Sequence, residues 1–281
     1  VHLQDGWRSA GAAGSGCAAY DHKIVANTYG YAAFGGQSLR LSNAVTSGCF
    51  GDQTFSQSLV DEAGETTAGN GGLSGGVRQP YYEAQWDFAS TVPGAEQPGL
   101  SVVASPDRGD GARMSWVQMA DTPAGLAVNF YDYQTGVNET GCTAGTNFVL
   151  TNVAGGLDRT VPHTVKVAVA FVDGPANDVV KVYVDGALVH TGTSWEDYFR
   201  ECEGNPSRTV DSILFRTGGS AAPDTLGKGF VVDNLRQYSG PALVGPPADK
   251  DACKNGGWAT FNVPRTFANQ GDCIQFAITG R

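Results

Sequence analysis

The sequence predicts an all-β protein in which two antiparallel sheets pack face to face as a jelly-roll sandwich. Along most stretches apolar residues alternate with polar ones, which is the period of a strand, and the 3.6-residue spacing of a helix is missing. Clusters of Gly, Pro, Asn and Asp separate these stretches, and the chain holds 39 glycines. Many strands without helices leave a sandwich or a barrel. The alternation favours a sandwich, because each strand then has one buried and one exposed side.

The expected strands follow one another with turn-forming connections. The clearest connection is Asp185-Gly186, because a tight hairpin turn needs positive φ at both central residues. We expect strands at residues 37–42, 81–89, 100–104, 113–119, 127–133, 163–171, 179–184, 187–190, 212–216 and 229–237.

The alternation also assigns a direction to each side chain. In the strand that contains them, Trp86 and Phe88 fall on the apolar side, and Glu83, Gln85 and Asp87 on the polar side. If the polar sides of several strands belong to one sheet, they form a surface of aromatic, amide and charged groups. Such a surface suits sugars, whose CH faces stack on rings and whose hydroxyls need hydrogen-bond partners. The predicted ligand-binding residues are Arg40, Glu83, Gln85, Trp116, Gln118, Asn129, Tyr131 and Tyr133, with Trp195 and Arg200 in an aromatic-rich connection at the rim.

Four runs of sequence resemble the concanavalin-like and laminin-G-like jelly-roll superfamily. They are Gly35–Asn43, His163–Val167, Val180–Gly186 and the closing Gly229–Leu235. Together they extend the resemblance over about residues 1–240. The resemblance implies the fold but not one function, because this superfamily includes lectins, hydrolases, lyases and adhesion modules.

A second unit is expected at the C-terminal end. The Gly- and Pro-rich segment around residues 240–247 is typical of a linker, which gives a sandwich domain at 1–242 and a second unit at 243–281. The second unit resembles a short Cys-bracketed segment that recurs in exported bacterial proteins. We expect it to be a small hairpin closed by a Cys253–Cys273 disulfide.

Cysteine usage indicates an oxidising compartment. The six cysteines show neither Cys-x-x-Cys nor Cys/His spacing, so zinc is not expected. An even number in a Gly-rich β protein favours three disulfides and a secreted or cell-surface location. The first five residues contain no signal-peptide pattern, so we expect a mature chain from which a signal was removed. Several pairings are possible, and the preferred set is Cys17–Cys49, Cys142–Cys202 and Cys253–Cys273.

Charge and hydropathy exclude other partners. The net charge is −10, with 18 basic and 28 acidic residues, which argues against nucleic acid. It also disfavours a highly anionic polysaccharide, unless basic side chains gather in one cleft. No apolar run approaches the roughly 18 residues that a membrane-spanning helix needs.

Hydrolysis is one alternative to simple binding. Laminarinase-type hydrolases of this fold carry Glu-x-Asp-x-Glu on one strand, and the string from Glu83 to Asp87 resembles it. The resemblance implies that Glu83 is the nucleophile and Asp87 the acid. The middle acid is Gln85 here, and the last residue is the shorter Asp. In an extended strand, positions i and i+4 lie roughly 13 Å apart at the backbone.

Elimination by a lyase is a second alternative. Polysaccharide lyases of this fold use an Arg, a Gln, a His and a Tyr, where Arg neutralises a uronate carboxylate and Tyr or His takes the proton. The resemblance implies Arg40, Gln118 and Tyr131 or Tyr133 for these roles. The lyase Gln-x-His string is absent, because Met119 stands where the His is expected, and His163 substitutes only if the fold brings it there.

One metal is also implied by the resemblance. Many modules of this superfamily hold a structural Ca²⁺ at an acidic position on the last strand, which Asp233 matches. Asp5 is expected beside it, because first and last strands usually pair. Calcium prefers several oxygen ligands, and two carboxylates do not specify it alone.

The sequence therefore favours a secreted, lectin-like glycan-binding module. A polysaccharide-cleaving hydrolase or lyase on the same face is the first alternative. A structural or self-assembling surface protein, with contacts between sheet edges, is the second.

Overall fold

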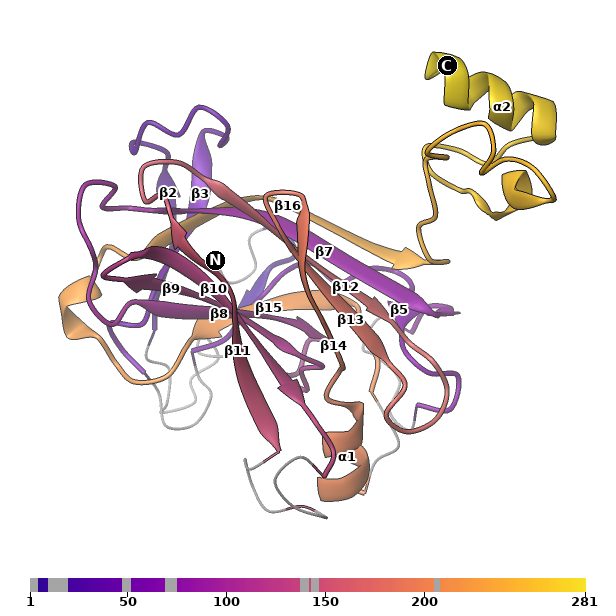
Figure 1. The fold of residues 1–281 in the computed structure, drawn as a ribbon. Coiled ribbons are helices and arrows are strands. Elements are labelled where there is room, and N and C mark those ends of the chain that lie inside the picture. Colours follow the sequence, from indigo (N-terminus) through magenta and orange to yellow (C-terminus); the bar gives the residue numbers. More distant parts are fainter. Residues whose placement is uncertain are drawn as a thin grey trace. The chain divides into compact units, whose positions relative to one another are not determined.

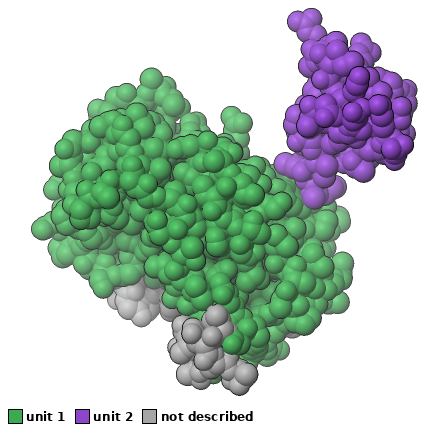
Figure 2. All heavy atoms as spheres, in the orientation of Figure 1, with its two compact units in different colours: residues 1–240 green, residues 241–281 purple. Residues whose placement is uncertain are grey.

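The computed structural model describes residues 5–9, 20–46, 52–68, 75–136, 142, 147–204 and 208–281. The chain divides into two compact units, Val1–Gly240 and Pro241–Arg281 (Figure 2). The first unit contains two packed antiparallel sheets of seven strands each, so the predicted all-β, two-sheet sandwich is confirmed (Figure 1). Within the described part of the chain, no helix is long and apolar enough to cross a membrane.

Sheet A has seven strands in the order β1-β4-β15-β8-β9-β10-β11. Its central strands pair antiparallel, and β9 and β10 are joined by a tight turn at residues 122–125. The strands are β1 Arg8–Ser9, β4 Thr54–Phe55, β15 Ser212–Thr217, β8 Ser101–Asp107, β9 Trp116–Thr122, β10 Gly125–Tyr133 and β11 Phe148–Leu157.

Sheet B also has seven strands, in the order β14-β13-β12-β7-β16-β3-β2. The Asp185-Gly186 hairpin is confirmed, with φ of 50° and 81° between β13 and β14. A short parallel pair, β5 Glu62–Ala63 and β6 Arg78–Gln79, forms a third sheet, and Ala63 is also bridged to Val210. The strands of sheet B are β14 Ala187–Gly192, β13 Val179–Val184, β12 His163–Ala170, β7 Tyr81–Ser90, β16 Phe230–Gly240, β3 Gln37–Ser42 and β2 Asp21–Ala26.

The core lies between the two sheets and confirms the alternation. Trp86 and Phe88 of β7 are fully buried, as are Met119 of β9 and Phe130 of β10. The rings of Trp86 and Phe215 meet edge to face, 5.8 Å apart, and join the two sheets at the centre. Burying a side chain of this size stabilises the fold by about 1.5–3 kcal/mol relative to exposure.

The expectation that the chain has no helix is wrong at two places. Helix α1 spans Glu196–Cys202 and helix α2 spans Gln270–Thr279, with 3₁₀ turns η2 at Pro223–Thr225 and η3 at Gly257–Thr260. Neither helix shows a long apolar stripe, so the sequence pattern misses them. In the second unit, α2 begins where the Asn269 side chain accepts a hydrogen bond from the Asp272 backbone, and it ends at Gly280 with φ of 70°. The expected hairpin is therefore a helical unit.

Two of the three expected disulfides are present. Cys142 pairs with Cys202 and Cys253 with Cys273. The tail bridge packs with Phe267 in a small core of its own. Cys17 and Cys49 lie outside the described residues.

Candidate functional site

The structure divides the predicted binding face between two sheets. Trp116 and Gln118 lie on β9, and Asn129 and Tyr131 on β10, all in sheet A. Glu83 and Gln85 lie on β7 of sheet B. Because the sheets pack through their apolar sides, their polar sides point in opposite directions. The assumption of one shared face is wrong, since alternation gives a residue's side but not its sheet.

Three of the predicted ligand-binding residues have partners within the protein. The guanidinium of Arg40 is buried on β3, where it pairs with the carboxylate of Asp21. Tyr133 is 3% exposed and donates its hydroxyl hydrogen bond to Glu201 at 2.7 Å. Arg200 on α1 donates to Glu65, as described below. Their position corrects the prediction that they face a ligand.

The lyase pattern does not assemble. Met119 points into the core, where it accepts a hydrogen bond from the Trp86 indole at 3.3 Å. This corrects the expectation at Met119: in the order Gln-x-His the third position is Ala120, which lies on the outer side of β9 and has no group that could take a proton. His163 belongs to sheet B, and its Nδ1 lies 2.8 Å from Asp185 Oδ2, so it does not reach the Gln118 side.

The two carboxylates implied for hydrolysis share the outer side of β7, as predicted, but each is engaged. Glu83 accepts from the Tyr81 hydroxyl at 2.7 Å and pairs with Lys166 at 3.4 Å. Asp87 accepts from Thr164 and Asn234 at 2.6 and 2.7 Å.

The predicted calcium position has protein donors around it. Asp233 accepts from the Ser38 hydroxyl at 2.7 Å and from the Gly35 amide at 3.2 Å. In the part of the chain that the structure describes, the one group of three acidic side chains placed to hold a metal lies elsewhere and does not include Asp5 or Asp233. It consists of Glu65, Asp178 and Glu196, whose oxygens lie within 4.8 Å of one another.

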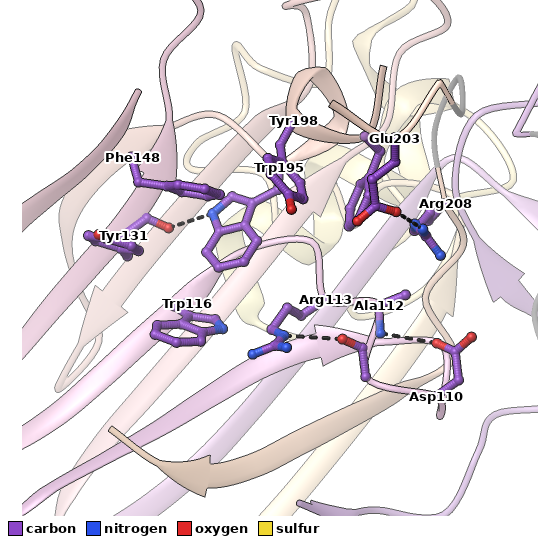
Figure 3. Close-up of a pocket in the computed structure, with 12 residues that line it drawn as sticks. Asp110, Ala112, Arg113, Trp116, Tyr131, Phe148, Trp195, Tyr198, Glu203 and Arg208 are labelled. Atoms are coloured by element: carbon purple, nitrogen blue, oxygen red, sulfur yellow. Dashed lines mark hydrogen bonds and ion pairs between the residues drawn. The ribbon is translucent and has the colours of Figure 1, made fainter. Parts of the chain in front are cut away.

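A cleft of about 560 Å³ opens on the outer side of sheet A (Figure 3). Of the predicted ligand-binding residues, it brings together Trp116, Tyr131 and Trp195. Its other lining residues are new: they come from the connection before β9, from the start of β11, and from α1 with the segment after it. These are Asp110, Gly111, Ala112, Arg113, Phe148, Tyr198, Phe199, Glu203 and Arg208.

Aromatic rings form the floor and one wall of this cleft. Trp116 and Tyr131 are directly opposed in register on β9 and β10, with ring centroids 5.9 Å apart and planes 28° apart. Phe148 stacks on Tyr131 at 5.5 Å with the planes 5° apart. Trp195 is held by its indole N–H, which donates to the Tyr131 carbonyl at 2.8 Å (Figure 3). The result is a row of flat faces across three neighbouring strands.

A row of amides, Gln118, Asn129 and Asn152, lies directly opposed in register on the same three strands, next to the aromatic row. Asn129 donates to Gln118 at 2.9 Å, and Asn152 donates to Asn129 at 2.8 Å. Gln118 donates in turn to the Ser101 hydroxyl at 2.7 Å. The chain of hydrogen bonds fixes each amide and leaves its second N–H or second lone pair for another partner. Gln118 and Asn129 were predicted; Asn152 was missed because β11 lacks clean alternation.

Guanidinium groups gather around Trp116. Those of Arg113 and Arg216 lie 5.3 and 5.9 Å from the indole ring, within the range of a cation–π contact. Arg208 lies 4.2 Å from the ring of Phe199 and pairs with Glu203. Burial lowers the pKa of Arg113 to about 10, and the positive charge of Arg216 acts in the same direction. Arg113 therefore still carries its charge at neutral pH.

The loop that carries Arg113 is held by a buried carboxylate. Asp107, at the end of β8, accepts from the backbone amides of Gly109, Asp110 and Gly111 at 2.5, 3.0 and 3.1 Å. Burial raises the pKa of Asp107 to about 6. The sequence placed Arg113 at the start of a strand, but this anchored loop places it in the cleft.

Helix α1 is fixed by a buried ionic network. Arg200 donates to both oxygens of Glu65 at 2.5 and 2.6 Å and lies 3.5 Å from Glu196. Burial raises the pKa of Glu196 to about 9, and its hydrogen bond with Glu65 acts in the same direction. The Cys142–Cys202 disulfide holds the other end of the helix. Because Tyr198 and Phe199 belong to α1, this network positions one wall of the cleft.

Comparisons with known proteins give a fold likeness. No model of a known family matches the sequence, and no curated protein matches it. An alginate lyase from Pseudomonas aeruginosa matches with 9% identity and a TM-score of 0.40, over 72% of this chain and 82% of its own. A family 7 alginate lyase in complex with substrate matches with 8% identity and a TM-score of 0.44, over 79% and 83%. The carbohydrate recognition domain of Emp46p matches with 12% identity and a TM-score of 0.34, over 67% and 77%. The chemistry of this protein is therefore argued from its own site.

Proposed function

We propose that this protein binds a glycan chain in the cleft on sheet A as a secreted, lectin-like module. One observation carries the proposal: a row of aromatic rings, including Trp116 and Tyr131, runs beside a row of fixed amides on the same strands. Sugar rings stack their CH faces on aromatic side chains, while their hydroxyls take hydrogen bonds from amides. Both needs are met on the outer side of sheet A, with the rings in the cleft and the amides on the same strands beside it.

The guanidinium groups add a preference for acidic sugars. Arg113 and Arg208 line the cleft, the latter paired with Glu203, and Arg216, which pairs with Asp52 at 3.4 Å, flanks the indole of Trp116. Guanidinium is the side chain best suited to a carboxylate or sulfate, because it offers parallel donors and keeps its charge. The net charge of −10 disfavours an acidic polymer, and Asp110 and Glu203 also line the cleft, but a guanidinium in direct contact with the ligand acts at much shorter range than screened surface charges. We therefore propose that acidic glycans bind more tightly than neutral ones.

Elimination in the same cleft is the second candidate. Tyr131 and Gln118 lie on the outer side of sheet A, near the guanidinium of Arg113. Tyr, Gln and Arg are three of the four residue types that polysaccharide lyases of this fold use. Arg113 would neutralise the uronate carboxylate and Tyr131 would take the proton. We favour binding, because Ala120 occupies the outward position where the lyase pattern has its histidine.

A glycan array followed by a product assay separates these functions. Binding alone predicts retention of an acidic glycan with no increase in reducing ends and no C=C absorbance. Unsaturated product that disappears in Tyr131→Phe would establish the lyase instead. If neither an acidic nor a neutral glycan is retained, the proposed function is wrong.

A further inference from the structure

A second row of polar and aromatic side chains crosses the outer side of sheet B. Gln85 on β7 lies directly opposite Lys166 on β12, and Lys166 directly opposite Tyr183 on β13. The three strands are neighbours in the sheet (Figure 1). Val182 and Val184, which flank Tyr183, point into the core, so the ring of Tyr183 points outward.

This row is held in place by its own contacts. Lys166 Nζ lies 4.3 Å from the centroid of the Tyr183 ring and 3.4 Å from the Glu83 carboxylate. Glu83 in turn accepts from the Tyr81 hydroxyl at 2.7 Å, and burial raises the pKa of Tyr81 above its usual value, so that hydroxyl stays a donor. The Glu83 and Lys166 side chains are 19% and 28% exposed. A side chain fixed before binding loses less conformational entropy when a ligand arrives.

The row surrounds a hollow of about 340 Å³, lined by Gln85, Thr164, Lys166, Tyr183 and Gly186. Gly186 has φ of 81° in the hairpin turn, and no atom beyond its chain neighbours lies within 4 Å of where a Cβ would stand. The hollow therefore stays open on that side. Its walls combine one flat ring with an amide, a hydroxyl and an ammonium group.

We propose that this hollow is a second carbohydrate site, in which Tyr183 stacks on a sugar ring while Gln85 and Lys166 donate to its hydroxyls. The proposal rests on the proposed function for the class of ligand. The hollow belongs to sheet B and the cleft to sheet A, so the two sites point away from each other across the sandwich. One molecule then holds two glycan chains and cross-links a polysaccharide.

Titration calorimetry and turbidity test this directly. The probe is the acidic oligosaccharide that the array selects, and its parent polymer serves for turbidity. Wild type should bind two oligosaccharides and make the polymer solution turbid. Tyr183→Ala should bind one, with at least about fivefold weaker binding at the second site, and should lose the turbidity. Trp116→Ala should also bind one and lose the turbidity.

Two matched variants complete the experiment. Tyr183→Phe keeps the ring and should keep both sites, and Lys181→Ala changes an exposed outward residue of the same strand and should behave as wild type. Suppose instead that the wild type binds one oligosaccharide, that Tyr183→Ala still binds one, and that Trp116→Ala binds none. That result overturns the second site and leaves the cleft in place. Wild type that binds no probe overturns both proposals. A thermal scan of each variant establishes that it is folded.

Discussion

Arg200 donates two hydrogen bonds to the carboxylate of Glu65, and this contact fixes helix α1 beside the cleft. Glu196, one turn earlier on the same helix, is fully buried against the same carboxylate, and this burial raises its pKa to about 9. Asp178, whose pKa burial raises to about 6, lies next to them. The wall of the cleft therefore depends on a carboxyl group that keeps its proton at neutral pH.

The first prediction concerns how stability depends on pH. The unfolded chain releases the Glu196 proton above its ordinary pKa of 4.5, while the folded chain keeps it until about pH 9. The free energy of unfolding should therefore fall as pH rises from about 4.5 to about 9. Glu196→Gln cannot release a proton, so its melting temperature should fall less over this range. Thermal scans between pH 5 and pH 9 compare the two, and equal slopes would contradict the assignment.

The second prediction concerns the tail disulfide. Cys253 and Cys273 are separated by 20 residues and belong to the small core of the second unit. On the chain-entropy model, a loop of this size contributes about 3 kcal/mol. A double Cys253→Ser and Cys273→Ser variant should unfold the tail and leave the melting temperature of the sandwich unchanged. Hydrogen exchange resolved along the chain measures the lost protection of the tail, and a thermal scan measures the melting temperature of the sandwich. Lost protection in β7 or β12 would show that the sandwich depends on the tail.

A third prediction separates core from surface tryptophans. Trp86 is fully buried between the sheets, whereas Trp116 is half-buried on the outer side of sheet A. Trp86→Ala should lower the free energy of unfolding by about 3–5 kcal/mol. Trp116→Ala should lower it by less than about 1.5 kcal/mol, because it leaves no enclosed cavity. Chemical denaturation gives both values, and the reverse order would mean that the two faces are exchanged.

The fourth prediction concerns the preference for acidic sugars. Arg113→Gln keeps a long polar side chain but removes the charge beside Trp116. Binding of an acidic glycan should weaken by about 5- to 20-fold, since one charge-assisted contact is lost, while a neutral glycan changes little. Titrations at low and high salt check this. An equal loss for both glycans would indicate that Arg113 acts only by holding the loop.

The fold was predictable because its signal is local. The pleat of β7 places Trp86 inward and Gln85 outward, whatever the order of strands in the sheet. Asp185-Gly186 predicts its hairpin because both residues tolerate the positive φ that the turn requires. The site was less predictable because it depends on which strands become neighbours. The sequence pattern of β7 or of β9 does not indicate that the two strands belong to different sheets.

Two further features were hidden for related reasons. Phe148 begins a strand at the sheet edge that is partly exposed on both sides, so its sequence lacks alternation. Helix α1 has only seven residues and is held by long-range partners such as Glu65 rather than by an apolar stripe. Contacts of that kind become visible only in three dimensions.

The most direct test of glycan binding on sheet A is the affinity of Trp116→Ala. Isothermal titration with the acidic oligosaccharide, in the wild-type and Tyr183→Ala backgrounds, isolates the cleft from the hollow on sheet B. With Lys181→Ala as the control, we predict that Trp116→Ala weakens binding in the cleft by about 5- to 150-fold, equivalent to roughly 1–3 kcal/mol, while the protein stays folded. A folded Trp116→Ala protein that binds in the Tyr183→Ala background with unchanged affinity would contradict the account.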